Sequence, residues 1–145
     1  MPLPSVWGPK AWELLHAIAN RAGQGVNQRL LADEQREVVW LFRHLEYMIP
    51  CPECRLHIVQ YRKANGGGPT SNYGEWMWNF HEAVNQRLGK NPGPPFDSAI
   101  GKDLNIRNAW NAYVEIVRES LQAGHLRSNE MKEWVRHLLL WVAFH

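Results

Sequence analysis

The sequence predicts an all-α fold in which helices pack on helices. Two observations carry this prediction: apolar residues recur at helical spacing along most of the chain, and no segment of useful length alternates apolar and polar residues with a period of two. With strands excluded, helix-on-helix packing is the remaining layer architecture. The chain has 145 residues, enough for a sizeable core, so we expect a single domain over residues 1–145.

The first helix is expected to be capped by Ser5, and the second to begin after the turn at 23–27. The apolar stripe of the first helix consists of Trp7, Ala11, Leu14, Leu15, Ile18 and Ala19. The stripe of the second consists of Val38, Leu41, Phe42, Leu45 and Ile49. Pro50 stops the second helix, which would therefore run without interruption almost to Cys51.

A short third helix is expected from Cys51 to the glycine-rich break at 66–69. Thr70 or Ser71 would cap the fourth helix, and Gly89 would end it. Its core face consists of Tyr73, Trp76, Met77, Phe80, Val84 and Leu88.

Two further helices are expected after a proline- and glycine-rich stretch from residue 90 to about 102. The fifth stripe consists of Ile106, Trp110, Tyr113, Val117 and Leu121. The sixth follows a cap at Ser128 and consists of Met131, Val135, Leu138, Leu139 and Val142.

Charge and hydropathy exclude several classes of partner. The formal net charge is only +2, from 16 Lys and Arg against 14 Asp and Glu, and the two signs are interleaved. Without a basic block to neutralise phosphates, we expect no nucleic-acid partner. No apolar run approaches the length of a bilayer span, and the first residues lack the layout of a signal peptide. We therefore expect a soluble, intracellular protein with no membrane partner.

The only two cysteines, Cys51 and Cys54, lie three residues apart. A disulfide that closes so short a loop constrains the unfolded chain little, so reactivity explains the pair better than stapling does. We expect Cys51 at the N-cap of the third helix, Pro52 at its first helical position and Cys54 in its first turn. Unpaired backbone N–H groups and the positive end of the helix dipole would stabilise a thiolate there.

A Cys-x-x-Cys motif also occurs in haem, thioredoxin-like and zinc sites. Haem attachment requires His directly after the second cysteine, where this chain has Arg55, and a thioredoxin-like site requires strands. Zinc stays the second interpretation, with Cys51, Cys54, His57 and either His81 or His44 as tetrahedral ligands. His57 has two open interpretations: a partner for a thiolate or a bound ring, or a solvated helix histidine.

The fourth helix carries a second stripe beside its core face, made of Trp78, His81, Asn85 and Leu88. An aromatic ring, an imidazole and a carboxamide in line offer stacking and directed hydrogen bonds, which suit a heterocyclic ligand lying along the helix. Trp12 and His16 repeat the theme one turn apart in the first helix. Each residue alone would be typical of a core, but together with the cysteine pair they favour a cofactor pocket.

With its motifs in this order, the chain resembles the Erv/ALR family of FAD-linked sulfhydryl oxidases, most of all the short viral members. The matching segments are Trp7-Gly8, Trp12 to His16, Pro50 to Cys54 with His57, His81 to Lys90, and Phe96-Asp97. The resemblance covers residue 7 to about 97, and the segment 81–90 is its most specific part. It implies an FAD-binding four-helix bundle of about residues 5–98, followed by a C-terminal helical extension of about 103–145.

The resemblance also implies roles for individual residues, with Cys51 and Cys54 as the catalytic disulfide. The implied FAD contacts are Gly8, Trp12, His16, Trp78, His81, Val84, Asn85, Leu88 and Lys90, to which His57 is added as an imidazole near the ring. No residue is expected to bind a metal. A substrate thiolate would attack Cys51 and release Cys54, and two electrons would pass through FAD to dioxygen, giving hydrogen peroxide.

The partners implied are thiol-containing substrate proteins, dioxygen and a second copy of the chain in a homodimer. If the protein is viral, we expect it in the host cytoplasm. The chain departs from the family pattern at Glu82, where Asn is usual, and at Ser98, where a second disulfide has its cysteine. It also has no third cysteine for a shuttle pair, so electrons would enter directly at Cys51 and Cys54. Two rival interpretations are a zinc-stapled helical adaptor that binds a protein partner through its tryptophans, and an inert bundle with an accidental cysteine pair.

Overall fold

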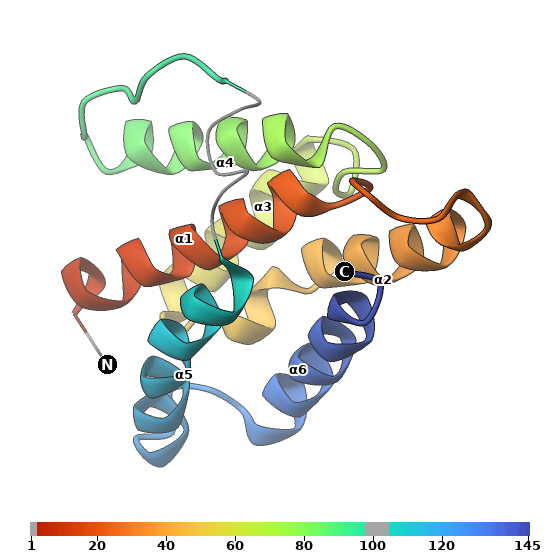
Figure 1. Ribbon diagram of the computed structural model, residues 1–145. Helices are drawn as coiled ribbons and strands as arrows, with labels where there is room; N and C mark the ends of the chain where they lie inside the picture. Colours follow the sequence, from red (N-terminus) through yellow and green to blue (C-terminus); the bar gives the residue numbers. More distant parts are fainter. Residues whose placement is uncertain (1–2, 98–104) are drawn as a thin grey trace.

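The computed structural model describes residues 3–97 and 105–145. These residues form six α-helices and two 3₁₀ turns and contain no strand, which confirms the all-α prediction (Figure 1). The elements are α1 (Pro4–Arg21), η1 (Gln28–Leu30), α2 (Leu31–Arg43), η2 (Leu45–Met48), α3 (Pro52–Ala64), α4 (Tyr73–Arg87), α5 (Ile106–Gln122) and α6 (Ser128–Val142). Ser98, at which the sequence departs from the family pattern, lies outside the described residues.

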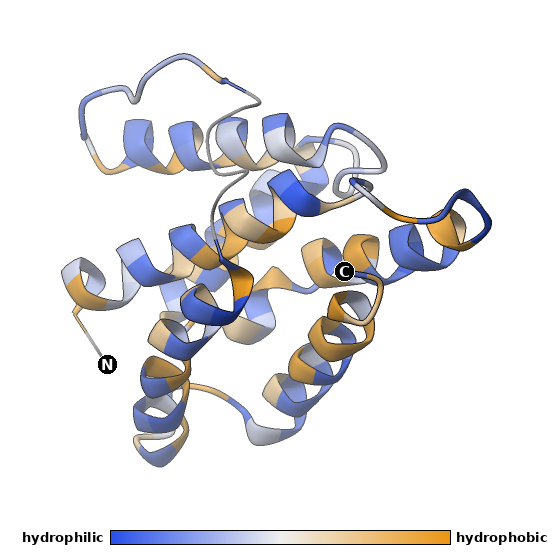
Figure 2. Cartoon of the chain, in the orientation of Figure 1, coloured by the Kyte–Doolittle hydropathy of each residue, from blue (hydrophilic) through white to orange (hydrophobic). Residues whose placement is uncertain are grey.

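Helix α1 crosses the middle of the molecule, with α4 along one side and the C-terminal helices on the other (Figure 1). The closest helix pairs are α1 with α5, α2 with α6 and α1 with α4. Figure 2 shows that α4 turns its hydrophobic side toward α1 and its hydrophilic side outward. The C-terminal helices therefore pack onto the first two helices, away from α4. None of the helices within the described ranges has the length and hydropathy needed to cross a membrane.

Helix α1 buries the predicted stripe but starts differently. All six residues of the stripe are buried. The helix begins at Pro4 with Leu3 as N-cap, and no side chain caps it, so the prediction that Ser5 is the cap is wrong. Proline suits the first helical position because its missing N–H is one that no helix turn would satisfy.

The prediction of one uninterrupted second helix is wrong. Helix α2 ends at Arg43, His44 leaves the helical region (φ −129°, ψ 30°), and η2 follows. The break places Leu45 and Met48 in the core, each 0% exposed. Ile49 is then extended (φ −100°, ψ 119°), so the chain reaches Cys51 as an extended segment.

Helix α4 shows two further corrections. Its N-cap is Asn72, in the left-handed region (φ 50°), so neither Thr70 nor Ser71 caps it. The Thr70 carbonyl instead accepts hydrogen bonds from Gln35 Nε2 (2.7 Å) and the Tyr73 hydroxyl (3.1 Å). Leu88, predicted in the core, is 54% exposed because the helix ends there and Gly89 turns the chain at φ +70°.

The C-terminal helices match the prediction in extent but only partly in the face they bury. Tyr113 and Val117 of α5 are buried as predicted, and Ile106, Trp110 and Leu121 pack against the core while partly exposed. In α6, Trp134 and Trp141 are 0% exposed, whereas Leu139 and Val142 are 64% and 38% exposed. Ser128 is the first residue of α6, and Arg127 is its N-cap. The end of α6, Leu138 to Val142, is apolar on every side, so the spacing of apolar residues did not define which side meets α2.

Candidate disulfide and cofactor site

A disulfide joins Cys51 and Cys54 at the start of α3. Cys51 is the N-cap, Pro52 occupies the first helical position, and the Cys54 backbone N–H donates to Cys51 Sγ at 3.3 Å. This is the arrangement that the sequence predicted. The first turn of a helix provides N–H groups without helical partners, and here one of them already points at a sulfur atom. A Cys51 thiolate would be stabilised at the same place after reduction.

Both cysteines line a mostly apolar cavity of about 250 Å³ between α1, the start of α3 and the end of α4, which we name the disulfide cavity. From α1 it is lined by Pro4, Trp7, Gly8, Ala11, Trp12 and Leu15; from Ile49 and α3 by Ile49, Cys51, Glu53, Cys54, His57 and Ile58; and from α4 and its end by Phe80, Val84, Asn85, Arg87, Leu88 and Lys90. The break between α2 and α3 thus places Cys51 and Cys54 in the wall of the disulfide cavity.

Two nitrogen atoms of cavity-lining side chains are buried without any hydrogen-bond partner. They are the indole Nε1 of Trp7 and Nδ1 of His57. A buried polar group without a partner costs free energy, so native proteins contain few of them. His57 is partly exposed, with Nδ1 on its buried side, so both interpretations of His57 stay predictions. Both nitrogens are suited to a ligand with polar edges in this cavity.

The first and fourth helices meet through three aromatic rings beside the cavity, of which Trp12 and His81 are stacked and His16 is tilted against both. Trp12 stacks on His81 with ring centroids 3.9 Å apart and planes at 10°. His16 Nε2 lies 2.9 Å from His81 Nδ1. Burial, and then the neighbouring His81, lower the pKa of His16 to about 4. Burial is also the main cause that lowers the pKa of His81. Both imidazoles are therefore neutral at pH 7, and one donates to the other.

A second hollow of about 310 Å³, the histidine pocket, lies on the other side of this stack. It is lined by Glu13, His16, Asn20, Gly74, Trp78, His81, Glu82, Asn85, Gly93, Pro94, Phe96 and Asp97. Asn85 lines both hollows, whereas Trp12 lines only the disulfide cavity and His81 only the histidine pocket. Two adjoining hollows that share one carboxamide suit a ligand made of two linked ring systems.

The loop that closes the histidine pocket is held by α4. Trp78 Nε1 donates to the Pro94 carbonyl at 3.1 Å, and Glu82 Oε1 accepts from the Gly93 N–H at 2.8 Å. A Cβ at Gly93 would lie 2.7 Å from Glu82 Oε1, so a larger residue there would make the Glu82 carboxylate shift. Glu82, which departs from the family pattern, therefore has a structural role in closing the loop.

The predicted cofactor residues divide between the two hollows. Gly8, Trp12, His57, Val84, Leu88 and Lys90 line the disulfide cavity, His16, Trp78 and His81 line the histidine pocket, and Asn85 lines both. Lys90 is placed by the end of α4, where its N–H donates to the Asn85 carbonyl at 2.8 Å. The sequence interpretation missed Arg87, a second cation at the cavity; its position one turn before Lys90 was the available signal.

The zinc interpretation has no ligand set among the described residues. Cys51 and Cys54 are bonded to each other, and no group of three or more His, Cys, Asp or Glu in residues 3–97 and 105–145 is arranged to hold a metal ion. His44, one candidate ligand, directs Nδ1 at the Trp40 carbonyl (2.8 Å) and stacks on the Trp40 ring.

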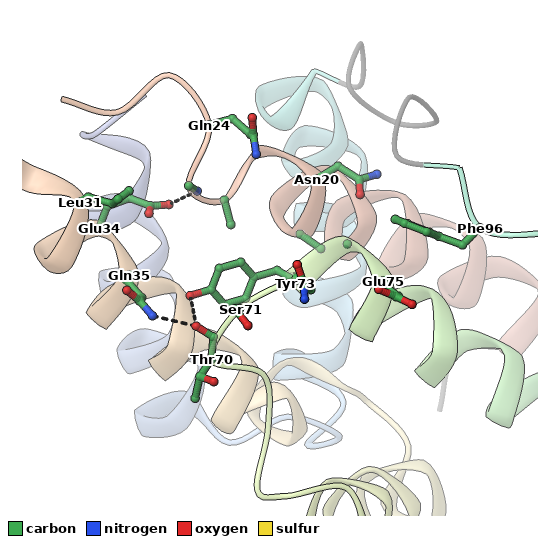
Figure 3. Close-up of a pocket in the computed structure, with 15 residues that line it drawn as sticks. Asn20, Gln24, Leu31, Glu34, Gln35, Thr70, Ser71, Tyr73, Glu75 and Phe96 are labelled. Atoms are coloured by element: carbon green, nitrogen blue, oxygen red, sulfur yellow. Dashed lines mark hydrogen bonds between the residues drawn. The ribbon is translucent and has the colours of Figure 1, made fainter. Parts of the chain in front are cut away.

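A larger hollow of about 530 Å³, between α1, α2 and the start of α4, is a poorer candidate for a redox site (Figure 3). Among the described residues that line it there is no cysteine or histidine. Glu34, Gln35 and Tyr73 point their polar groups at neighbouring backbone, as the dashed lines in Figure 3 mark. This hollow is organised by hydrogen bonds between its own walls, so the candidate site stays at the disulfide.

Comparisons with known proteins point the same way. The sequence pattern of the Erv1/Alr family matches residues 9–111. A protein named FAD-linked sulfhydryl oxidase from African swine fever virus (isolate Pig/Kenya/KEN-50/1950) is 30% identical over 86 residues, which are 58% of this chain and 69% of that protein. The FAD-linked sulfhydryl oxidase ERV1 of Oryza sativa subsp. japonica is 29% identical over 85 residues, 57% of this chain and 42% of that protein. No solved structure gave a significant match. The family match extends into α5, past the end predicted for the family core at about residue 98.

Proposed function

The chain belongs to the Erv1/Alr family, and we propose that it is an FAD-dependent thiol oxidase that makes disulfides in substrate proteins by exchange at Cys51–Cys54. Its membership of the family and the names of its relatives support the flavin-dependent thiol chemistry. The observation that carries the residue assignment is that the only cysteine pair of the chain lines a mostly apolar cavity with Trp12 and His57.

The two hollows fit FAD by shape and by chemistry. The disulfide cavity has apolar walls for a flat ring, and the unpartnered nitrogens of Trp7 and His57 suit the polar edges of such a ring. Arg87 and Lys90 provide cations for a pyrophosphate. The histidine pocket, with Trp78 and the neutral His16–His81 pair, suits a second heterocycle. When bound, FAD supplies an acceptor for two electrons, and we propose dioxygen as their destination, with hydrogen peroxide as product.

The protein's own part in the reaction is thiol–disulfide exchange. Two substrate thiols give up two protons and two electrons to the Cys51–Cys54 disulfide, so one disulfide forms in the substrate and the Cys51–Cys54 bond breaks to two thiols. The Cys54 N–H and the start of α3 stabilise the Cys51 thiolate as it forms.

The order in which the two sulfurs react stays a proposal. We propose Cys51 as the sulfur that the substrate attacks, with Cys54 as the leaving thiolate. Cys51 is only 6% exposed, so a folded substrate would have to present its thiol on a flexible segment. The test mixes single-cysteine variants with the oxidised, disulfide form of a substrate, so that the remaining enzyme thiolate attacks that disulfide and releases one substrate thiolate. A mixed disulfide in Cys54→Ser, and none in Cys51→Ser, is the expected result; the reverse would exchange the two roles.

We also propose that the protein forms a homodimer and acts inside cells, in the host cytoplasm if it is viral. Family membership supports the dimer, and light scattering on the pure protein tests it. The location rests on chemistry alone: a dedicated oxidase is needed where thiols are otherwise kept reduced. Imaging of the tagged protein in its native cells tests the location.

The direct test of the proposed function is an absorption spectrum with an oxygen electrode. Purified protein should be yellow, should release FAD on unfolding, and should consume dioxygen in the presence of a small dithiol. A colourless, folded protein whose melting temperature does not change with added FAD would contradict the proposal. Metal analysis of the same sample separates it from the zinc-stapled adaptor.

A further inference from the structure

The extended segment that leads to Cys51 is tied to the C-terminal helices by hydrogen bonds to its backbone. Tyr113 on α5 donates its hydroxyl hydrogen to the Met48 carbonyl. Arg55 donates from Nε to the Ile49 carbonyl at 2.6 Å and from a terminal nitrogen to the His125 carbonyl, between α5 and α6, at 2.8 Å. These three hydrogen bonds, which we name the carbonyl clamp, join the segment before Cys51, the start of α3 and the C-terminal helices.

The carbonyl clamp is buried at Tyr113 and partly buried at Arg55. Tyr113 and Met48 are each 0% exposed, and Ile49 is 4% exposed. Burial raises the pKa of Tyr113, against a smaller lowering by Arg55, so the hydroxyl keeps its proton and stays a donor. Arg55 reaches two carbonyls from different elements because its guanidinium carries several N–H groups in a fixed plane. Loss of either donor would leave a buried carbonyl without its partner.

The segment is packed in the core but has little regular backbone hydrogen bonding of its own. It lies between η2 and α3 and is extended at Ile49, so it makes no helical hydrogen bonds there. On the far side of the motif, the Cys51 carbonyl accepts from the Arg55 N–H at 2.9 Å. When the disulfide is open, the covalent link between the two sulfurs is gone, and Cys51 is held by its backbone, by its packing in the core and by the Cys54 N–H.

We propose that the carbonyl clamp is a positioning device for the redox pair, in which Arg55 and the C-terminal helices hold Cys51 within bonding reach of Cys54 in the reduced protein. Two thiols held close together have a high effective concentration, which favours closing the bond. Loosening the clamp lowers that effective concentration. The dithiol then becomes more favoured, and the disulfide becomes a stronger oxidant.

The interpretation of the disulfide as catalytic rests on the proposed function, but the equilibrium itself involves only the two sulfurs. The test equilibrates the full-length protein with reduced and oxidised dithiothreitol without oxygen. Reduced dithiothreitol transfers two electrons and two protons to the Cys51–Cys54 disulfide, giving two thiols and oxidised dithiothreitol. Alkylation and mass spectrometry then count the free thiols. A protein without FAD or turnover would contradict the proposed function and still give this equilibrium.

Tyr113→Phe and Arg55→Lys are the variants that loosen the clamp. Each should shift the equilibrium toward the dithiol about tenfold, a change of about 30 mV to a more positive potential. The matched controls are Tyr73→Phe, whose hydroxyl binds the Thr70 carbonyl, and Arg62→Lys, which on the same helix binds Glu46 at 2.7 and 2.9 Å. Both controls lose similar hydrogen bonds far from the sulfurs, so their potentials should stay within about 10 mV of the wild type.

Two results would overturn the proposal. One is an unchanged potential in Arg55→Lys when circular dichroism shows the variant folded. The other is an equal shift in the two control variants, which would assign the effect to general loss of stability. Should Tyr113→Phe not fold, Arg55→Lys with Arg62→Lys still decides the question, because Arg55 is partly exposed and its lysine variant keeps the charge.

Discussion

Buried ring N–H groups differ in their hydrogen bonding between the two sides of the molecule. On the side of the C-terminal helices, Trp134 Nε1 donates to the Leu41 carbonyl at 3.3 Å and Trp141 Nε1 to Glu34 at 2.7 Å. On the side of the disulfide cavity, Trp7 Nε1 and His57 Nδ1 are buried without a partner. Glu34 Oε2, Trp76 Nε1 and Ser120 Oγ are also buried without a partner among the described residues, so what distinguishes the disulfide cavity is that two unpartnered nitrogens line one hollow, which suits a ligand there.

The largest effect is expected at the sulfurs. Cys54→Ser should abolish dithiol oxidation, because no disulfide remains to accept electrons from the substrate. FAD binding should persist, since serine keeps the cavity wall in place. Oxygen uptake and the flavin spectrum of the same sample measure both quantities. Turnover above a few per cent of the wild type would show that thiols reach the flavin without the cysteine pair.

A matched pair of tryptophan variants separates the two sides. Trp134→Ala should lower the free energy of unfolding by about 3–5 kcal/mol, because Trp134 is fully buried and its indole is satisfied. Trp12→Ala removes a cavity wall that is partly buried, and it should weaken FAD binding about tenfold, or about 1.4 kcal/mol. Chemical denaturation and FAD titration measure the two effects. The comparison fails if folded Trp134→Ala protein binds FAD as weakly as Trp12→Ala does.

The neutral histidine pair predicts a pH dependence of stability. The pKa of His16 is about 4 in the folded protein and near the ordinary histidine value of 6.5 in the unfolded chain. Between these values the unfolded chain binds more protons, so stability falls as the pH drops from 6.5 to 4. His16→Asn should flatten this part of a melting-temperature profile. An unchanged slope would mean that other groups cause the acid sensitivity.

The smallest effect is expected on the outer face of α5. Arg118 and Glu115 form an ion pair at 2.9 Å, but their side chains are 67% and 60% exposed. Arg118→Ala should therefore change the free energy of unfolding by less than about 0.5 kcal/mol and leave the disulfide potential unchanged. A larger change in either would indicate that the C-terminal helices act through their surface and not through the carbonyl clamp.

Local patterns in the sequence were sufficient to predict the order of the helices and the residues that start α3. Cys51 and Pro52 define their own positions, because an N-cap and a first-turn proline are local features. The break at His44 was not predictable in this way: it depends on Leu45 and Met48 both finding the core, and on Trp40 stacking against His44. The same limit applies to α6, whose buried side was decided by contact with α2.

The sequence predicted those site residues whose side-chain type determines their chemistry. It did not predict residues whose role depends on backbone groups far away in the chain. Trp12, His81 and Asn85 were found because aromatic, imidazole and carboxamide groups at helical spacing are unusual for a solvent face. Arg55 was noted only as the residue that excludes haem attachment. Its structural role was missed because its carbonyl partners lie 6 and 70 residues away, and nothing in the local sequence points to them.

The central claim is that the disulfide cavity holds FAD beside Cys51 and Cys54, and filling the cavity tests it most directly. Val84→Trp places a large ring inside the cavity, and Val135→Trp, a matched change at a partly buried site on α6, places the same ring elsewhere. The ratio of bound FAD to protein, read from the absorption spectrum of each folded variant, is the measurement. We predict near-stoichiometric FAD in the wild type and Val135→Trp and almost none in Val84→Trp. A folded Val84→Trp protein that keeps its full complement of FAD would contradict the claim.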